Sequence, residues 1–300
     1  MDPNPVLGKL GFADDDRVVI IHADDVGMCQ ASVAAFADLV EFGLVSSGAV
    51  MVPCPWFLEA AAYCRQHPEA DVGVHSTLTS EWETYRWGPI STRDPASGLL
   101  DAQGCLHRTT QAIHEHGRPE AVEVELQAQL ARALAAGIDV THLDTHMGAV
   151  AHPKFMLGYV QLAVARGLPP LMLRLDEAGW RAVGLDAQAA AYAAELVCKW
   201  EAEGLPLLDN LAGLPLDRPD DRVAQAKTVL GGLPAGLTHL IIHPATDTPE
   251  LRAITPDAAG RVADYQAFSS AELRNYVRNL GLQVIGYRAL RELMRRSRSG

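Results

Sequence analysis

Short runs of β-branched residues alternate with longer Ala-rich stretches along the chain. Residues 17–22 are apolar enough for a buried strand, and residues 30–42 then repeat apolar positions at helical spacing until Gly43. The same alternation predicts further strands at 47–52, 71–75, 139–145, 171–175, 238–243 and 283–287, a weaker strand at 205–211, and helices at 57–66, 120–136, 153–166 and after the last strand to residue 296.

Strands and helices that alternate without interruption indicate parallel strands joined by crossover connections. We therefore expect an α/β fold, a distorted (β/α) barrel of about seven parallel strands, with an open doubly wound sheet as the alternative that periodicity leaves open. No linker or shift in composition marks a second domain, so residues 1–300 are expected to form one. Segment 80–119 is too long for a simple connection, and we expect a loop insertion there that faces substrate or a partner.

Composition and charge exclude several classes of protein. Apolar residues make up 48% of the chain and charged residues 21%, as in ordinary globular proteins. The net charge of −12 repels phosphate backbones, so we expect no nucleic-acid partner. The least charged stretch, residues 43–58, is broken by prolines and too short to span a bilayer, so we expect no membrane partner.

The cysteines and the N-terminal segment bear on the cellular compartment. The five cysteines are widely spaced and include no Cys-x-x-Cys pair, which argues against a disulfide framework and against a zinc ribbon. Residues 1–17 have no apolar core behind a basic start, unlike a signal peptide. We therefore expect a cytoplasmic protein.

Titratable side chains lie at or near the carboxyl ends of five predicted strands. In parallel α/β folds these ends face the βα loops, where active sites form. Five strands that share this feature therefore predict a functional site. The residues are His22, Asp24, Asp25, His75, His142, Asp144, His146, Arg174 and His243.

The fourth predicted strand carries three such residues at alternate positions. An extended backbone points His142, Asp144 and His146 to one face. Burying them together costs several kcal/mol unless something satisfies them, and a divalent cation is a natural partner. The alternative is a polar strand end that hydrogen-bonds to neighbouring loops.

Asp24 and Asp25 form a second unusual feature, because adjacent carboxylates repel and each normally needs its own partner. One could ligate a metal while the other acts as an acid–base group. Adjacent side chains on a regular strand point to opposite faces, so both reach one site only if the chain turns, as Gly27 would allow. The alternative is that one of them caps the helix that starts near Met28.

Two common kinds of catalytic site are missing from the sequence. No Walker or Gly-x-Gly-x-x-Gly loop follows the first strand, and no Gly-x-Ser-x-Gly elbow occurs. What remains is one carboxylate with two or three imidazoles, which suits zinc or a similar divalent ion with an open position for water.

Four segments, in order and at matching spacing along nearly the whole chain, resemble the signature segments of YdjC/ChbG-type carbohydrate deacetylases. They are His22–Gly27, Gly73–Thr79, Thr141–His146 and Ile242–Ala245. The resemblance implies a polysaccharide-deacetylase-like (β/α) barrel. It also implies a metal-dependent hydrolase that removes an acetyl group from a small N-acetylated amino sugar or oligosaccharide.

The resemblance implies a role for each matched residue. Asp25, His75 and His146 would hold one divalent metal ion, zinc or magnesium, and Asp24 would be the catalytic base. The resemblance also implies roles for two further residues. His243 resembles the general acid of related deacetylases, and Arg174 resembles the arginine that steadies the catalytic aspartate.

The sequence departs from the family pattern at two places. His22 stands where the family commonly has Asn, and Met147-Gly-Ala follows His146 where many members have a His-rich stretch. Roles of the missing histidines in substrate contact or metal choice are therefore in doubt.

Aromatic residues gather in the insertion. Trp82, Tyr85 and Trp87 suit the apolar faces of pyranose rings, and with Asp144 they are our candidates for substrate contact. The alternative is that they anchor the loop to the barrel or to a second subunit. These aromatics and the family resemblance also favour a homodimer.

Two other functions remain open at this point. One is a non-catalytic sugar- or metal-binding barrel, although the Asp24–Asp25 pair argues against it because a binding protein needs no base. The other is a metallohydrolase that acts on another amide or ester; a phosphoester substrate lacks support, since no Lys/Arg cluster could clamp a phosphate.

Overall fold

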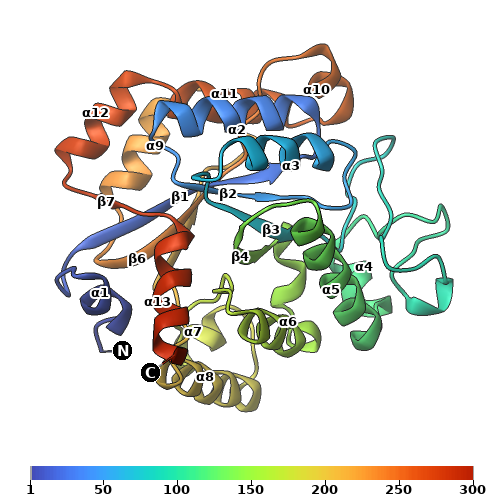
Figure 1. The fold of residues 1–300 in the computed structure, drawn as a ribbon, viewed down its shortest axis with the longest axis horizontal. Coiled ribbons are helices and arrows are strands. Elements are labelled where there is room, and N and C mark those ends of the chain that lie inside the picture. Colours follow the sequence, from blue (N-terminus) through green and yellow to red (C-terminus); the bar gives the residue numbers. More distant parts are fainter. Residues whose placement is uncertain (1, 300) are drawn as a thin grey trace.

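A computed structural model describes residues 2–299, which form a seven-stranded sheet in which every strand pair is parallel (Figure 1). The sheet order is β4-β3-β2-β1-β6-β5, and β7 pairs with β1 near its start. The strands are β1 (Arg17–Val26), β2 (Ser47–Val50), β3 (Val72–Ser76), β4 (Val140–Thr145), β5 (Asn210–Gly213), β6 (Gly236–Ile242) and β7 (Gln283–Val284).

Residues 169–174 bridge the two edge strands. The N–H of Leu171 donates to the carbonyl of Leu143 in β4 at 2.7 Å, and the N–H of Arg174 donates to the carbonyl of Leu208 just before β5 at 2.7 Å. This bridging closes the sheet into a distorted (β/α) barrel, as predicted, and rules out the open sheet. The strand predicted at 171–175 is reduced to isolated bridges, one of which involves Pro170, a residue that cannot donate to a ladder.

Helices pack around the outside of the sheet (Figure 1). Four predicted helices occur within one residue of their expected bounds, and α2 ends as expected at Gly43, whose φ of 79° suits glycine. Within residues 2–299, no helix combines the length and the apolar character needed to cross a membrane. The helices are α1 (Pro5–Leu10), α2 (Gln30–Phe42), α3 (Phe57–Gln66), α4 (Thr110–His116), α5 (Pro119–Ala135), α6 (Pro153–Arg166), α7 (Glu177–Ala182), α8 (Ala187–Ala202), α9 (Arg222–Gly231), α10 (Pro249–Ile254), α11 (Ala258–Phe268), α12 (Ala271–Asn279) and α13 (Tyr287–Ser299).

The segment predicted as an insertion, 80–119, contains little regular structure apart from α4 and the short 3₁₀ helix η1 (Pro95–Ser97). Arg86 organises part of it from within, because its guanidinium donates to the carboxylate of Asp101 and to the carbonyl of Leu106. In Figure 1 these residues form the extended loops beside α4. Internal hydrogen bonds therefore give the insertion a defined shape.

Candidate active site

The end of β1 brings two adjacent carboxylates to one site because the backbone turns at Asp25. Asp25 has a φ of 62°, and the β1–β2 register shifts between Ala23 and Val26. A non-glycine residue in this conformation costs about 1–2 kcal/mol, and such strain is often found at functional sites. Neither aspartate caps the next helix, since α2 begins at Gln30 after Cys29 as its N-cap.

Asp25, His75 and His146 bring three potential ligand atoms together. Asp25 Oδ1 lies 3.3 Å from His75 Nε2 and 3.2 Å from His146 Nδ1. This oxygen is buried and has no hydrogen-bond partner among the described residues. Three atoms that each lie about 2 Å from one ion in a tetrahedral arrangement are roughly 3.3 Å apart. The donor set, its spacing and the unsatisfied oxygen therefore fit one divalent ion.

The outer nitrogen of each imidazole is held by a carboxylate. His75 Nδ1 lies 2.8 Å from Asp144 Oδ1, and His146 Nε2 lies 3.0 Å from Glu81 Oε2. Such pairs fix the ring orientation and make the opposite nitrogen a better metal ligand. Glu81 belongs to the insertion, and no motif in the sequence singled it out.

These carboxylates also determine the charge of the two histidines. Burial alone would lower the pKa of His75, but Asp144 and Asp24 raise it well above its ordinary value. Burial acts in the same direction on His146, but Glu81 and Asp25 raise its pKa to about 9. The site is therefore strongly anionic around its imidazoles, which favours binding of a cation.

The structure corrects the expectation that Asp144 contacts substrate. Its side chain is fully buried beneath His75, where it accepts a hydrogen bond from the imidazole. The trio at alternate positions of the fourth strand does point into the barrel, but its members do not meet at one ion. Only His146 joins the cluster with Asp25, whereas His142 bonds to His22 deeper in the barrel. Strand alternation predicts the face of a side chain but not its depth.

Arg261, which the sequence analysis missed, supports Asp25 from α11. Its Nη1 donates to Asp25 Oδ2 at 2.7 Å, and both residues are buried. Burial would raise the pKa of Asp25, but Arg261 holds it well below its ordinary value. Arg261 lies inside a helix and outside the four signature segments, so no local signal identified it.

Asp24 lies between the imidazole cluster and the open rim. Its Oδ2 is 3.6 Å from His75 Nε2 and 3.9 Å from Nε2 of His243, which follows β6 and is half-buried. Burial would raise the pKa of Asp24, but His75 and a hydrogen bond from His22 hold it below its usual range. Asp24 is thus an ionised proton acceptor beside the candidate metal site.

Comparison with known protein families agrees with this geometry. The sequence model of the family described as "YdjC-like protein" matches residues 18–279, which span every residue of the site. The chain belongs to the YdjC family.

The chain resembles two deacetylases, one over nearly its whole length and the other over about half of it. A carbohydrate deacetylase from Thermus thermophilus is 34% identical over 96% of this chain and 99% of its own. A chitooligosaccharide deacetylase from Yersinia enterocolitica is 30% identical, over 54% of this chain and 60% of its own.

A solved structure supports the fold that the YdjC family membership suggests. It is the crystal structure of a "putative cellobiose-phosphate cleavage protein" from Enterococcus faecalis. That structure superposes with a TM-score of 0.73 at 21% identity, over 92% of this chain and 99% of the other.

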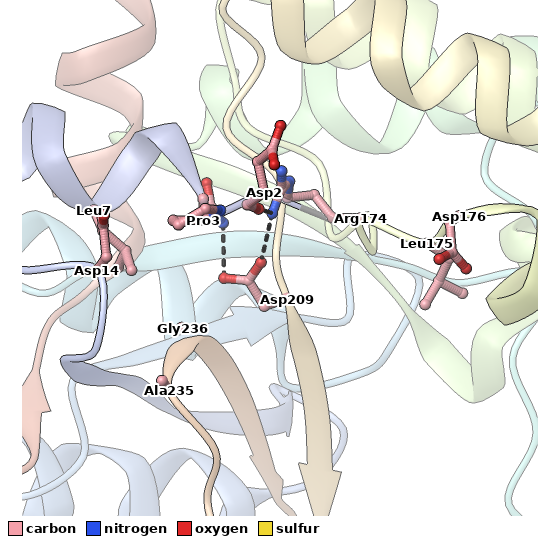
Figure 2. Close-up of a pocket in the computed structure, with 11 residues that line it drawn as sticks. Asp2, Pro3, Leu7, Asp14, Arg174, Leu175, Asp176, Asp209, Ala235 and Gly236 are labelled. Carbon is pink, nitrogen blue, oxygen red and sulfur yellow. Dashed lines mark hydrogen bonds and ion pairs between the residues drawn. The ribbon is translucent and has the colours of Figure 1, made fainter.

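Arg174 does not reach the site of this YdjC family member. Figure 2 shows it beside Asp209, near Gly236 where β6 begins, and Asp24 lies at the opposite end of the parallel sheet. Its Nη1 donates to Asp209 Oδ1 at 3.1 Å, and its Nε pairs with Glu201. The prediction that Arg174 steadies Asp24 is therefore wrong, because Arg174 bonds to the backbone of Leu208 just before β5, at the amino-terminal end of the sheet.

The aromatic residues of the insertion make hydrogen bonds and packing contacts within the protein. The Trp87 indole N–H donates to the carbonyl of Thr79 at 2.8 Å, and the Tyr85 hydroxyl donates to the carbonyl of Met28 at 2.6 Å. Trp82 is also buried, 5.5 Å from the Arg261 guanidinium. These contacts favour the alternative in which the aromatics anchor the insertion to the barrel, and a sugar contact by any of the three stays a prediction.

Proposed function

We propose that this protein removes the acetyl group from an N-acetylated amino sugar or oligosaccharide, with one zinc or magnesium ion held by Asp25, His75 and His146. The observation that carries the proposal is a second ionised carboxylate, Asp24, 3.6 Å from one of the imidazoles. A protein that only bound metal or sugar would need no such base. The names of the Thermus and Yersinia relatives support the substrate class.

The chemistry divides between the ion and the side chains around it. A divalent ion, when bound, supplies a Lewis acid that polarises the acetyl carbonyl and makes water more acidic. Asp24 accepts a proton from the attacking water while a bond forms from the water oxygen to the acetyl carbon. The carbon–nitrogen bond then breaks, and His243 in its protonated form gives a proton to the leaving amine. Acetate and a free amino sugar are the products.

The surrounding residues keep these groups in place. Asp144 and Glu81 hold the two imidazoles with their inner nitrogens toward Asp25. Arg261 binds the outer oxygen of Asp25 and compensates its buried charge. The catalytic groups therefore start in the geometry that the reaction needs, which is where much of the rate enhancement of enzymes arises.

Acetate release tests the proposal. The protein is stripped with a chelator, reloaded with zinc or magnesium, and incubated with N-acetylglucosamine, N,N′-diacetylchitobiose and longer chitooligosaccharides. We expect acetate only from the metal-loaded protein, and no acetate after chelation. An aryl acetate ester and a non-sugar acetamide serve as controls for a general amidase or esterase. Failure of the loaded protein on every sugar, or full activity after chelation, would contradict the proposal.

A further inference from the structure

A chain of buried hydrogen bonds leads from Asp24 into the barrel interior. His22 Nδ1 lies 2.7 Å from Asp24 Oδ1, and His22 Nε2 lies 2.9 Å from His142 Nε2. His142 Nδ1 lies 2.9 Å from Thr141 Oγ1, which donates to Asp71 Oδ1 at 2.5 Å. All five side chains are buried, so water does not compete for these bonds.

The far end of this hydrogen-bond chain, at Asp71, determines which nitrogen of His142 carries a proton. Burial raises the pKa of Asp71 above its ordinary value of 3.8, but donors from Thr141, Ser47 Oγ and the backbone N–H of Arg288 favour the ionised carboxylate. Asp71 therefore acts as an acceptor toward Thr141. Thr141 gives its hydroxyl proton to Asp71 and must therefore accept from His142 Nδ1. Burial, together with His22 and His239, holds the pKa of His142 well below its ordinary value, so its ring is neutral and Nε2 carries no proton.

This assignment determines the protonation of His22. Since His142 Nε2 can only accept, His22 Nε2 must donate to it. Because the carboxylate of Asp24 also accepts, His22 Nδ1 must donate as well. His22 thus carries a proton on both nitrogens and forms a cation against Asp24.

Packing holds this arrangement rigid. A Cβ atom at Gly73 of β3 would lie 2.5 Å from His142 Cε1, so glycine at this position makes room for the imidazole. The opposite side of the ring stacks on Tyr287, with centroids 3.8 Å apart. His239 lies against the His22 ring, with centroids 4.6 Å apart.

One further charged group faces the cation. Asp144 Oδ2 is buried without a hydrogen-bond partner among the described residues and lies 3.6 Å from His22 Nε2. The groups that surround His22 are therefore two carboxylates and three neutral rings, which compensate a positive charge. They are Asp24, Asp144, His142, His239 and Tyr287.

We propose that His22 is the positioning residue for Asp24: a doubly protonated imidazole, backed by His142, that binds Oδ1 and leaves Oδ2 directed toward His75 and His243. The role of His22 rests on the proposed function of Asp24 as base. Its protonation state does not, because that follows from the hydrogen bonds of Asp71, Thr141 and His142 together with the neutral, buried ring of His142. The two parts can therefore be tested separately.

Nitrogen NMR of the metal-free protein, labelled with ¹⁵N-histidine, tests the protonation state without any assay of activity. At neutral pH we expect directly bonded protons on both nitrogens of His22. For His142 we expect a proton on Nδ1 only. The signals are assigned from their loss in the His22→Asn and His142→Asn variants. A His22 ring with one unprotonated nitrogen would overturn this part of the proposal.

Kinetics of three metal-loaded variants test the positioning role, on the N-acetylated oligosaccharide that gives wild type its highest rate. His22→Asn keeps a donor at the position of Nδ1, whereas His22→Leu removes it. We expect kcat to fall on the order of 100-fold in His22→Leu, with KM and metal content unchanged, and less than about 10-fold in His22→Asn. His107→Asn is the matched control, because His107 is also buried but bonds to the carbonyl of Gly98 in the insertion rather than to Asp24; its kcat should stay within about threefold of wild type.

The outcomes separate this proposal from the proposed function. Equal losses in His22→Asn and His22→Leu would show that the donor to Asp24 is not what matters, and would overturn the positioning role. A normal kcat in a folded His22→Leu variant would do the same. If wild type released no acetate from any sugar, the proposed function would fail, while the NMR result would still decide the state of His22.

Discussion

Arg261 donates to Asp25 Oδ2 at 2.7 Å, while the other oxygen of the same carboxylate lies 3.2 Å from His146 Nδ1. One carboxylate is thus shared between α11 and the candidate metal site. The guanidinium compensates the buried charge and fixes the rotation of the carboxylate. Metal affinity should consequently depend on a residue that is not itself a ligand.

Replacing Arg261 with Met tests this dependence. We expect zinc affinity to fall about 10–100-fold, because Asp25 loses the partner that orients it. The free energy of unfolding should also fall by about 3–5 kcal/mol, since a buried charge is left without its partner. Chelator competition and urea unfolding measure the two effects, with Arg261→Lys as the charge-preserving control. Unchanged metal affinity in a folded Arg261→Met protein would contradict the role given to Arg261.

Replacing Asp24 with Asn removes the proposed base and leaves the three ligands in place. We expect kcat for acetate release to fall by about 10²–10⁴-fold, which is the usual contribution of a general base. Metal content should stay at the wild-type level. Asp15→Asn, a change at an exposed aspartate near the start of β1, is the control. Unchanged turnover in Asp24→Asn would refute the role of Asp24.

Trp87 should matter for stability more than for substrate binding. It is buried, and its indole N–H bonds to the carbonyl of Thr79, so Trp87→Ala should cost about 3–5 kcal/mol of unfolding free energy. Trp87→Phe keeps an aromatic ring in the core but loses part of the packed volume and the hydrogen bond, and should cost less than Trp87→Ala. Urea unfolding and KM are measured together. A raised KM at normal stability would instead favour a sugar contact.

The sequence predicted most of the barrel because β-branched runs and helical periodicity depend on local residues. Residues 169–174 were predicted less well, since their bridges to β4 and β5 depend on how the barrel closes. The sequence predicted that Asp24 and Asp25 reach one site only if the chain turns, and it suggested Gly27 as the residue that allows this. In the structure the turn falls at Asp25 itself. Arg261 could not be found, because which arginine reaches Asp25 is decided by tertiary packing of α11.

A cluster at the other end of the barrel gives a pH-dependent prediction. Hydrogen bonds from Arg291 and Arg288 of α13 hold the pKa of Asp139 below its ordinary value of 3.8. A depressed pKa stabilises the fold above the unfolded-state value, and the contribution is lost as pH falls through the folded-state value. Because Asp139 is about half exposed, the contribution should be below about 1 kcal/mol.

Comparison of wild type with Asp139→Asn measures this contribution. The wild-type urea midpoint should be slightly higher near pH 7, and the difference should shrink as the pH falls below the ordinary value of 3.8 and through the lower folded-state pKa of Asp139. A difference that stays constant over this range would mean that the charge of Asp139 is not responsible.

Crystals grown with zinc offer the most direct measurement of the ligand set, through the anomalous scattering of the bound ion. This ligand set predicts one peak inside the barrel mouth, about 2 Å from Asp25 Oδ1, His75 Nε2 and His146 Nδ1, and its absence in His146→Ala crystals. A peak held instead by the deeper residues around His22, or no bound ion at all, would contradict it.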